Sequence, residues 1–364
     1  FTRVAFLSNS SVGGFTRNGS LPEVSGGALY SRGGNLKVRD CTFFGNAVLG
    51  SGGNRSGGTG GEAAGGAIDS DDSGFLVGTI FAGNTARGGN SRNGLVGSSL
   101  SGAPAYGGAL RAGASLAMTN CTFTSNAVYG GAAGGFGSPS GEARGGAISV
   151  IAGIPMLVNV TLASNSVNVP APFGSPVPSF GMNIDAATNF SITLKNSLLA
   201  GTSNNVWGQI IDGGYNMSSD GSANFSSGTS FNFTNPKLLP LANNGGWTLT
   251  MALASDSPAI DWVPAALAPS TDQRGVHRPY GSASDVGAYE VGAPPPSLVI
   301  LRNGGSVKIL FAVETGSNYH IQHSLNLSTW ETVQTTGTST SNGVWTATFP
   351  VSQPAEYYRV TMDL

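Results

Sequence analysis

Carboxylates are the side chains of this chain with the clearest capacity for chemistry. Hydrolysis of a glycosidic bond needs two carboxylates that face each other across a sugar. The first 200 of the 364 residues offer Glu23, Asp40, Glu62, Asp69, Asp71, Asp72, Glu142 and Asp185. Only Asp69, Asp71 and Asp72 are close to one another in sequence. They could hold a Ca²⁺ ion loosely, or they could form a solvated acidic turn. We favour the solvated turn and keep these three as weak metal candidates.

Histidine chemistry has little support, because no histidine precedes His277. The densest charged set lies near it and comprises Asp261, Asp272, Arg274, Asp285 and Glu290. These residues could form a metal or sugar site. They could instead form structural ion pairs in which Arg274 binds one or two of the carboxylates. We favour structure and expect no catalytic residue, no cofactor and no enzymatic activity.

A repeat must position these side chains. Gly-Gly-Ala followed by Leu or Ile begins at Gly26, Gly65, Gly107 and Gly145, and each copy leads to an apolar-x-x-Asn step. A further step, Phe6 to Asn9, comes first. The asparagines of these steps are separated by 37, 38, 42 and 39 positions. A repeat of this kind describes one supersecondary unit stacked on copies of itself.

Apolar residues alternate with a period of two inside each copy, which predicts strands with one buried face. The segment from Leu36 to Phe43 shows the pattern, with one break near Asp40. Removing a Gly/Ser-rich surface loop, such as residues 50–58, leaves about 22 residues per turn, enough for a few short strands. Parallel stacking at about 4.8 Å then gives a parallel β-helix, right-handed by precedent.

The repeat also predicts which side chains stack along the coil. The expected apolar ladder is Phe43, Phe81, Phe123 and Leu162, and the expected amide ladder is Asn46, Asn84, Asn126 and Asn165. We expect the asparagines to adopt the left-handed backbone of a corner and to bond to the turns above and below. Cys41 and Cys121 fall two turns apart on the inner face, too far for a disulfide, and should be free thiols.

Composition excludes several functions. With 17 Lys and Arg against 19 Asp and Glu, the net charge of −2 gives no electrostatic case for nucleic acid. The sequence contains no run of 18 apolar residues and therefore predicts no membrane span. The start at Phe1 suggests a processed product whose export signal was upstream.

The chain is therefore expected to be all-β: a single-stranded parallel β-helix followed by a small C-terminal antiparallel β-sandwich. Residues 1–234 should form the coil with its Gly-rich loops, and residues 235–291 should close it. Residues 292–296 form a Pro linker. Residues 297–364 contain short alternating runs separated by turn signals and should form the sandwich.

Two stretches resemble known families. The paired Gly-Gly-Ala-Ile/Leu and Phe-x-x-Asn steps of residues 1–165 resemble the repeats of chlamydial polymorphic outer-membrane proteins. Residues 235–291, with Asp272-Gln273-Arg274-Gly275 and Asp285-Val286-Gly287-Ala288-Tyr289-Glu290, resemble the choice-of-anchor Q domain of secreted bacterial proteins. The resemblance implies export and surface display and carries no catalytic residues.

Two functions remain open. The first is a non-catalytic, exported structural or adhesive protein, extracellular or at the cell surface. Its first repeat shows no cap, so a copy of the chain could dock there and build a head-to-tail filament. The second is a carbohydrate-active β-helix, either a polysaccharide lyase or hydrolase or a glycan-binding module. Expected partners are thus the chain itself or surface glycans.

Overall fold

The computed structural model is all-β and divides into two units, Phe1–Gly292 and Ala293–Leu364. It describes residues 1–14, 23–53, 59–91, 101–134, 138–170, 179–186, 189–292, 298–313, 318–336, 343–351, 353 and 356–362. The expected linker of residues 292–296 lies, apart from Gly292, outside the described residues. No helix in these ranges is long and apolar enough to cross a membrane.

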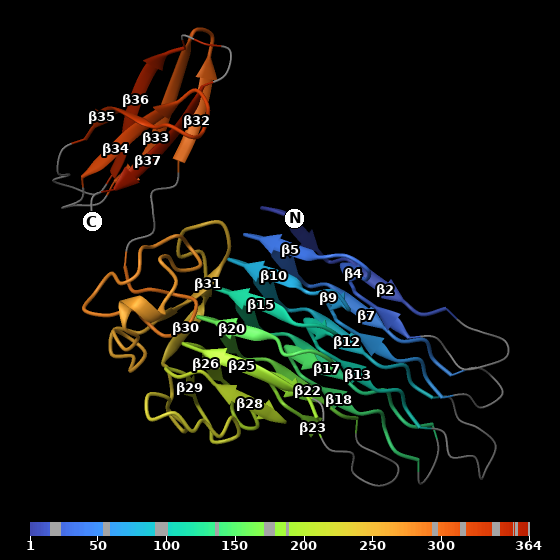
Figure 1. The fold of residues 1–364 in the computed structure, drawn as a ribbon. Helices are drawn as coiled ribbons and strands as arrows, with labels where there is room; N and C mark the ends of the chain where they lie inside the picture. Colours follow the sequence, from blue (N-terminus) through green and yellow to red (C-terminus); the bar gives the residue numbers. More distant parts are fainter. Residues whose placement is uncertain are drawn as a thin grey trace. The chain divides into compact units, whose positions relative to one another are not determined.

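The first unit is a parallel β-helix, as the repeat predicts (Figure 1). Each full turn contributes one strand to each of five parallel sheets, which we name after the strands of one turn. These strands are β8 (Ala63–Ala64), β9 (Ile68–Ser70), β10 (Gly74–Val77), β11 (Ile80–Ala82) and β12 (Thr85–Arg87). The β11 sheet is the longest, with seven strands in the order β1-β6-β11-β16-β21-β26-β29.

The remaining coil strands follow the same order. The first turns hold β1 (Ala5–Leu7), β2 (Ser10–Val12), β3 (Val24–Ser25), β4 (Leu29–Ser31), β5 (Leu36–Arg39), β6 (Thr42–Phe44) and β7 (Ala47–Leu49). The next two hold β13 (Ala105–Tyr106), β14 (Leu110–Ala112), β15 (Leu116–Thr119), β16 (Thr122–Thr124), β17 (Ala127–Tyr129), β18 (Ala143–Arg144), β19 (Ile148–Val150), β20 (Met156–Val158), β21 (Thr161–Ala163) and β22 (Ser166–Asn168). The coil ends with β23 (Ser179–Phe180), β24 (Ile184–Ala186), β25 (Ser191–Lys195), β26 (Leu198–Ala200), β27 (Val206–Trp207), β28 (Gln209–Asp212) and β29 (Met217–Ser218).

An apolar ladder runs through the coil at the β11 sheet. Phe43, Phe81 and Phe123 are fully buried, and their rings stack with centroid distances of 4.9 and 4.5 Å. Leu162 pairs with Phe123 in the next turn. The spacing matches the rise between parallel strands, so one ring per turn fills the interior without a gap.

An amide ladder runs beside it. Nδ2 of Asn46 donates to Oδ1 of Asn84 at 2.9 Å. The same bond, at the same distance, joins Asn84 to Asn126 and Asn126 to Asn165. Asn183 and Asn205 extend the ladder beyond the recognisable repeat. Each buried amide thus finds partners in adjacent turns, which a polar side chain in a core requires.

The prediction that these asparagines adopt a left-handed backbone is wrong. The residue with positive φ is the one before each asparagine: Gly45 (64°), Gly83 (64°), Ser125 (55°) and Ser164 (56°). The physical reason is the direction in which the asparagine side chains must point. The preceding residue takes the bend, which leaves each asparagine's own side chain aimed into the coil to reach the next turn.

A second left-handed corner explains the break in alternation at Asp40. Asp40, Gly78, Asn120, Asn159 and Asn196 have φ between 51° and 62° and separate the β10 sheet from the β11 sheet. The segment from Leu36 to Phe43, in which the sequence shows one break near Asp40, therefore contains two strands, β5 and β6. Cys41 lies just after this corner, and Cys121 occupies the same place; both are buried and free. Burial raises the pKa of the Cys121 thiol to about 12.

The Gly-rich connections between the β12 and β8 sheets are not merely surface loops in their described parts. Successive backbones hydrogen-bond along the axis: the amide of Gly61 donates to Ser51, that of Gly89 to Gly61, and that of Ala103 to Gly89. A Cβ on Gly89 would lie 1.9 Å from the Ser51 carbonyl oxygen. Glycine is needed here because backbone packs directly on backbone.

Residues 235–291 do not close the coil, contrary to the sequence-based expectation. Ala223 and Phe225 belong to the coil's hydrophobic core, so the segment after β29 closes that end instead. Residues 235–291 lie beside the coil, as Figure 1 shows in yellow and orange. They include β30 (Leu238–Ala242), β31 (Thr250–Leu253) and a 3-10 helix, Ala265–Leu267.

The second corner supplies the bonds that hold this flanking segment. Side-chain amides of Asn120, Asn159 and Asn196 donate to the carbonyls of Thr271, Asp285 and Leu267 at 2.7, 3.1 and 2.9 Å. These corner residues come from successive turns. A lateral segment that contacts several turns resists their separation, whereas an end cap would contact only the last turn.

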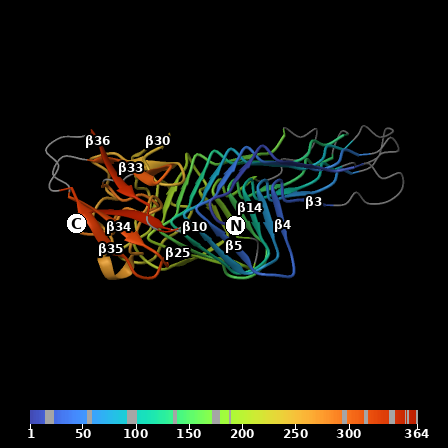
Figure 2. The ribbon, with the colours of Figure 1, turned by 90° about the horizontal axis from the view of Figure 1, so that it is seen from above.

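The second unit contains two three-stranded antiparallel sheets, which matches the predicted sandwich. One sheet has the order β32-β33-β36 and the other β35-β34-β37. The strands are β32 (Leu298–Asn303), β33 (Ser306–Val313), β34 (Tyr319–Ser324), β35 (Glu331–Thr335), β36 (Gly343–Pro350) and β37 (Tyr357–Met362). Phe311 and Tyr319 meet across the two sheets with a centroid distance of 5.4 Å. Figure 2 shows the ribbon from above.

Asn84→Ala should destabilise the coil by about 3 kcal/mol or more, because it strands buried donors of Asn46 and removes two donated bonds. The thermal midpoint of the far-UV circular dichroism signal measures this change. Asn9→Ala is the matched control: Asn9 is exposed and donates one side-chain bond, so it should cost less than about 1 kcal/mol. Equal shifts for both variants would contradict the role of the ladder.

Gly89→Ala should prevent ordered stacking of the glycine segments, because the new methyl group meets the Ser51 carbonyl and the Gly61 amide. Gly52→Ala is its control within the same connections, since its nearest neighbour would be the Asn90 carbonyl at 3.7 Å. Limited proteolysis compares the two. We expect faster cleavage between the β12 and β8 sheets only for Gly89→Ala, and identical digestion patterns would refute the close packing.

Candidate binding face on the coil

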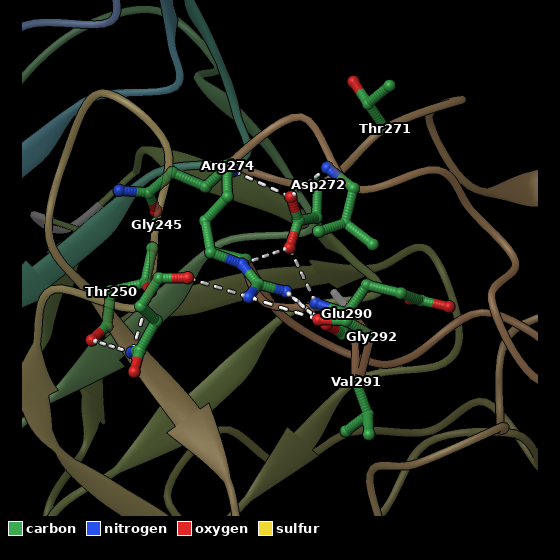
Figure 3. A network of polar contacts seen from close by, with 12 residues as sticks. Gly245, Thr250, Thr271, Asp272, Arg274, Glu290, Val291 and Gly292 are labelled. Carbon is green, nitrogen blue, oxygen red and sulfur yellow. Dashed lines mark hydrogen bonds and ion pairs between the residues drawn. The ribbon is translucent and has the colours of Figure 1, made fainter. Parts of the chain in front are cut away.

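The charged set around Arg274 is a buried structural network (Figure 3). Nε of Arg274 donates to Oδ2 of Asp272 at 2.9 Å, and its Nη atoms donate to the carbonyls of Glu290 and Asn244. The guanidinium also lies 3.8 Å from the centre of the Tyr289 ring. Asp272 and Arg274 are almost fully buried, so a metal or sugar could not reach them.

Arg278 forms a second ion pair, which sequence reasoning missed. Its Nη1 lies 2.7 Å from Oε2 of Glu290 and also donates to the Asp285 carbonyl. Burial raises the pKa of Glu290, and the Arg278 guanidinium opposes that rise. Among the described residues, the Asp285 carboxylate forms no ion pair with an arginine and instead accepts the backbone amides of Asp261 and Val291. The signal was present in the sequence, because Arg278 lies four residues after Arg274 in the same polar stretch.

The three acidic residues kept as metal candidates do not share a ligand position. Asp69 forms a bidentate pair with Arg111 at 2.6 and 2.9 Å. Asp72 accepts the amides of Gly33 and Gly34 and the hydroxyl of Ser31 in the previous turn. Asp71 lies 3.8 Å from Arg32. Among the described residues, no group of three His, Cys, Asp or Glu side chains could hold a metal ion.

Instead, the coil brings charged and aromatic residues together on the outside of the β8 and β9 sheets. We call this surface the β8–β9 face. In the β9 sheet, the inner positions hold core residues such as Ile68 and Leu110, so the next residue of each strand points outward. In register, these outward residues are Tyr30, Asp69, Arg111, Ser149, Asp185 and Trp207. The β8 sheet adds Tyr106, Arg144 and Phe180.

Two arginines are fixed on this face by buried acids. Arg111 pairs with Asp69 and also lies 3.4 Å from Glu23. Arg144 lies 2.9 Å from Glu142 and 3.5 Å from Asp185, and its guanidinium covers the Phe180 ring at 4.0 Å. Asp69 and Asp185 have no exposed side-chain surface. They orient the arginines and cannot touch a ligand themselves.

A column of glutamates borders the arginines. Three of the four Gly-Gly-Ala motifs have a glutamate three residues before them: Glu23, Glu62 and Glu142. Before the remaining motif, at Gly107, this position holds Pro104. Burial, followed by the charges of Glu62 and Glu142, raises the pKa of Tyr106 to about 12. Six of the eight carboxylates considered from the sequence therefore lie on one face, with Asp40 and Asp72 elsewhere.

This arrangement is better suited to binding than to catalysis. A hydrolase needs a proton-donating carboxyl group that reaches the scissile oxygen. Burial raises the pKa of Asp185 to about 6, yet its side chain is enclosed by Arg144 and Ser149. The groups that reach solvent are glutamates and the rings of Tyr30 and Trp207, which can accept hydrogen bonds and offer flat apolar surfaces.

The sequence contained the signal for this face, but only as register. Once the Gly-Gly-Ala motifs are aligned, Asp69 and Arg111 fall in one column. The turn of Asp185 has Gly181-Met182-Asn183 in place of the motif, and the strand register of the structure adds Asp185 to that column. Sequence reasoning searched for carboxylates that are neighbours in the chain. It therefore singled out Asp69, Asp71 and Asp72 and left Arg111, Arg144 and Trp207 aside.

Stability should depend on pH through Asp185. An acid whose pKa rises on folding stabilises the fold most below its unfolded pKa, and that contribution is lost as pH rises through the folded value. Relative to Asp185→Asn, the wild type should lose about 1–3 kcal/mol between about pH 4 and pH 7. Denaturation midpoints at a series of pH values measure the difference. Asp71→Asn is the matched control, and a difference that does not vary with pH would contradict the expectation.

Comparisons with known proteins assign no family to this geometry. A scan against protein-family models finds no match, and a search of curated proteins finds no matching relative.

Proposed function

We propose that this chain is a non-catalytic, exported structural or adhesive protein of the cell surface or extracellular space. The observation that carries the proposal is the pair of continuous ladders, in which each turn fixes the next by stacked rings and amide bonds. Such a coil is a rigid support that presents outward side chains at a constant spacing.

Export is supported by the resemblance of residues 1–165 to the repeats of chlamydial polymorphic outer-membrane proteins. The similarity of residues 235–291 to the choice-of-anchor Q domain supports the same location. The flanking position of that segment fits a structural role, because its polar residues bind the coil rather than a ligand.

End-to-end assembly is part of the proposal. In the described residues, β1 to β4 each pair with a strand of the following turn only, which leaves their other edges unpaired, whereas residues 1–3 cover the outer edge of β5. Leu7 and Val12 expose 59 and 64% of their surface there. Unpaired strand edges with apolar side chains accept further strands. Because the segment after β29 closes the other end of the coil, we propose that a strand or the C-terminal unit of a second copy docks on this end and builds a head-to-tail filament.

A carbohydrate-binding role is the second candidate, because the exposed glutamates and rings of the β8–β9 face suit a sugar. Catalysis of sugar cleavage is less well supported, since Asp69 and Asp185 are enclosed. Binding and structural roles are compatible in an adhesive protein.

The chain should form elongated assemblies whose mean mass rises with concentration. Light scattering coupled to size-exclusion chromatography, together with negative-stain images, measures this. The double variant Leu7→Lys, Val12→Lys should remain monomeric, because charge on an edge strand opposes pairing.

Ile154→Lys is the control, because Ile154 is similarly exposed, at 53%, but lies away from that edge. It should assemble like the wild type. Monomers across the whole concentration series would refute assembly, and loss of assembly in the control would show that the edge is not responsible.

A further inference from the structure

We propose that the β8–β9 face binds a neutral polysaccharide strand that lies along the axis of the coil. This inference rests on the proposed adhesive function and gives it a ligand class and a site. Its elements are the outward column Tyr30 to Trp207, the neighbouring Tyr106 and Phe180, and the exposed glutamates.

The geometry fits a linear ligand with a short repeat. The column has six positions, one per turn, which at a rise of about 4.8 Å gives a length of about 24 Å. Asp69, Ser149 and Asp185 within it are buried, so the ligand contacts come from the rings at its ends and from the exposed glutamates beside it. Tyr30 and Trp207 stand at its two ends and expose 48 and 49% of their surface. The Phe180 ring meets the Trp207 ring edge-on at a centroid distance of 5.0 Å and steadies it. Such rings stack on the apolar faces of pyranose units.

The polar groups fit hydroxyl groups. Glu142 exposes 42% of its side chain while Arg144 holds it at 2.9 Å, so its orientation is fixed and its remaining oxygen is available. Carboxylates accept hydrogen bonds and guanidiniums donate them in a fixed plane. Preorganised groups of this kind reduce the entropic cost of binding a flexible chain.

Charge excludes acidic polysaccharides. Six carboxylates, Glu23, Glu62, Asp69, Asp71, Glu142 and Asp185, face three guanidiniums, Arg32, Arg111 and Arg144. The surplus is negative and repels uronate chains. A peptide that adds a strand is disfavoured along the track, because each inner strand of both sheets already pairs on both sides and only the end strands, such as β3 and β4, offer an edge.

Affinity gel electrophoresis of the full chain tests the proposal. The gels contain β-glucan, galactomannan or arabinoxylan as neutral probes and polygalacturonate or alginate as acidic probes. At least one neutral probe should retard the chain, and neither acidic probe should. Trp207→Ala and Glu142→Ala should each weaken retardation at least about five-fold, because each removes one direct contact.

Trp247→Ala is the matched control: Trp247 is an exposed tryptophan, at 63%, on the flanking segment near Arg3. It should bind like the wild type, and circular dichroism verifies that all variants fold. The proposal is overturned if no neutral probe binds, if Trp207→Ala binds unchanged, or if only acidic probes bind.

Assay of reducing ends separates the two levels of the argument. Sugar release that Trp207→Ala abolishes would support the site while refuting a non-catalytic function. Neutral-probe binding without release supports both. Filament assembly without any binding would refute the site and leave the structural function standing.

Discussion

The structure depends on one constraint: equivalent side chains of successive turns must stack at the spacing of parallel strands. That spacing suits an aromatic ring and an asparagine amide equally well. The rings of Phe43, Phe81 and Phe123 fill the interior. The side-chain amides of Asn46 and Asn84 are buried there and hydrogen-bond to one another. An insertion between the ladder phenylalanine and the ladder asparagine would break both ladders at once. Most variation in length therefore lies in the Gly-rich connections, and the step from the β9 sheet to the β10 sheet varies by one residue.

Glycine has two different roles in this architecture. At corners such as Gly45, it supplies a left-handed backbone beside an inward asparagine. In the connections, Gly61 and Gly89 allow backbone to pack on backbone with no side chain between them. The second role explains the high glycine content, 56 residues, better than loop flexibility does.

Charged residues are divided by burial into two classes. Asp272, Arg274, Arg278 and Glu290 are enclosed and hold an irregular segment against the coil. On the β8–β9 face, Arg111 and Arg144 each have a buried carboxylate behind them and an exposed one beside them. The first arrangement can only stabilise structure, because breaking a buried pair strands a charge. The second leaves groups that a ligand can reach, which is why we place binding there.

The sequence by itself determined the coil, its ladders and the C-terminal sandwich, because a fixed period of stacked residues has few physical solutions. The order of side chains within a turn could also be read from the Gly-Gly-Ala alignment. Only the tertiary structure decided that residues 235–291 lie along the side of the coil, since their bonds to Asn120, Asn159 and Asn196 depend on corners that local pattern does not reveal. It also decided which carboxylates are neighbours. Stacking brings Asp69, Arg111 and Asp185 into one column, and distance along the chain gives no measure of that proximity.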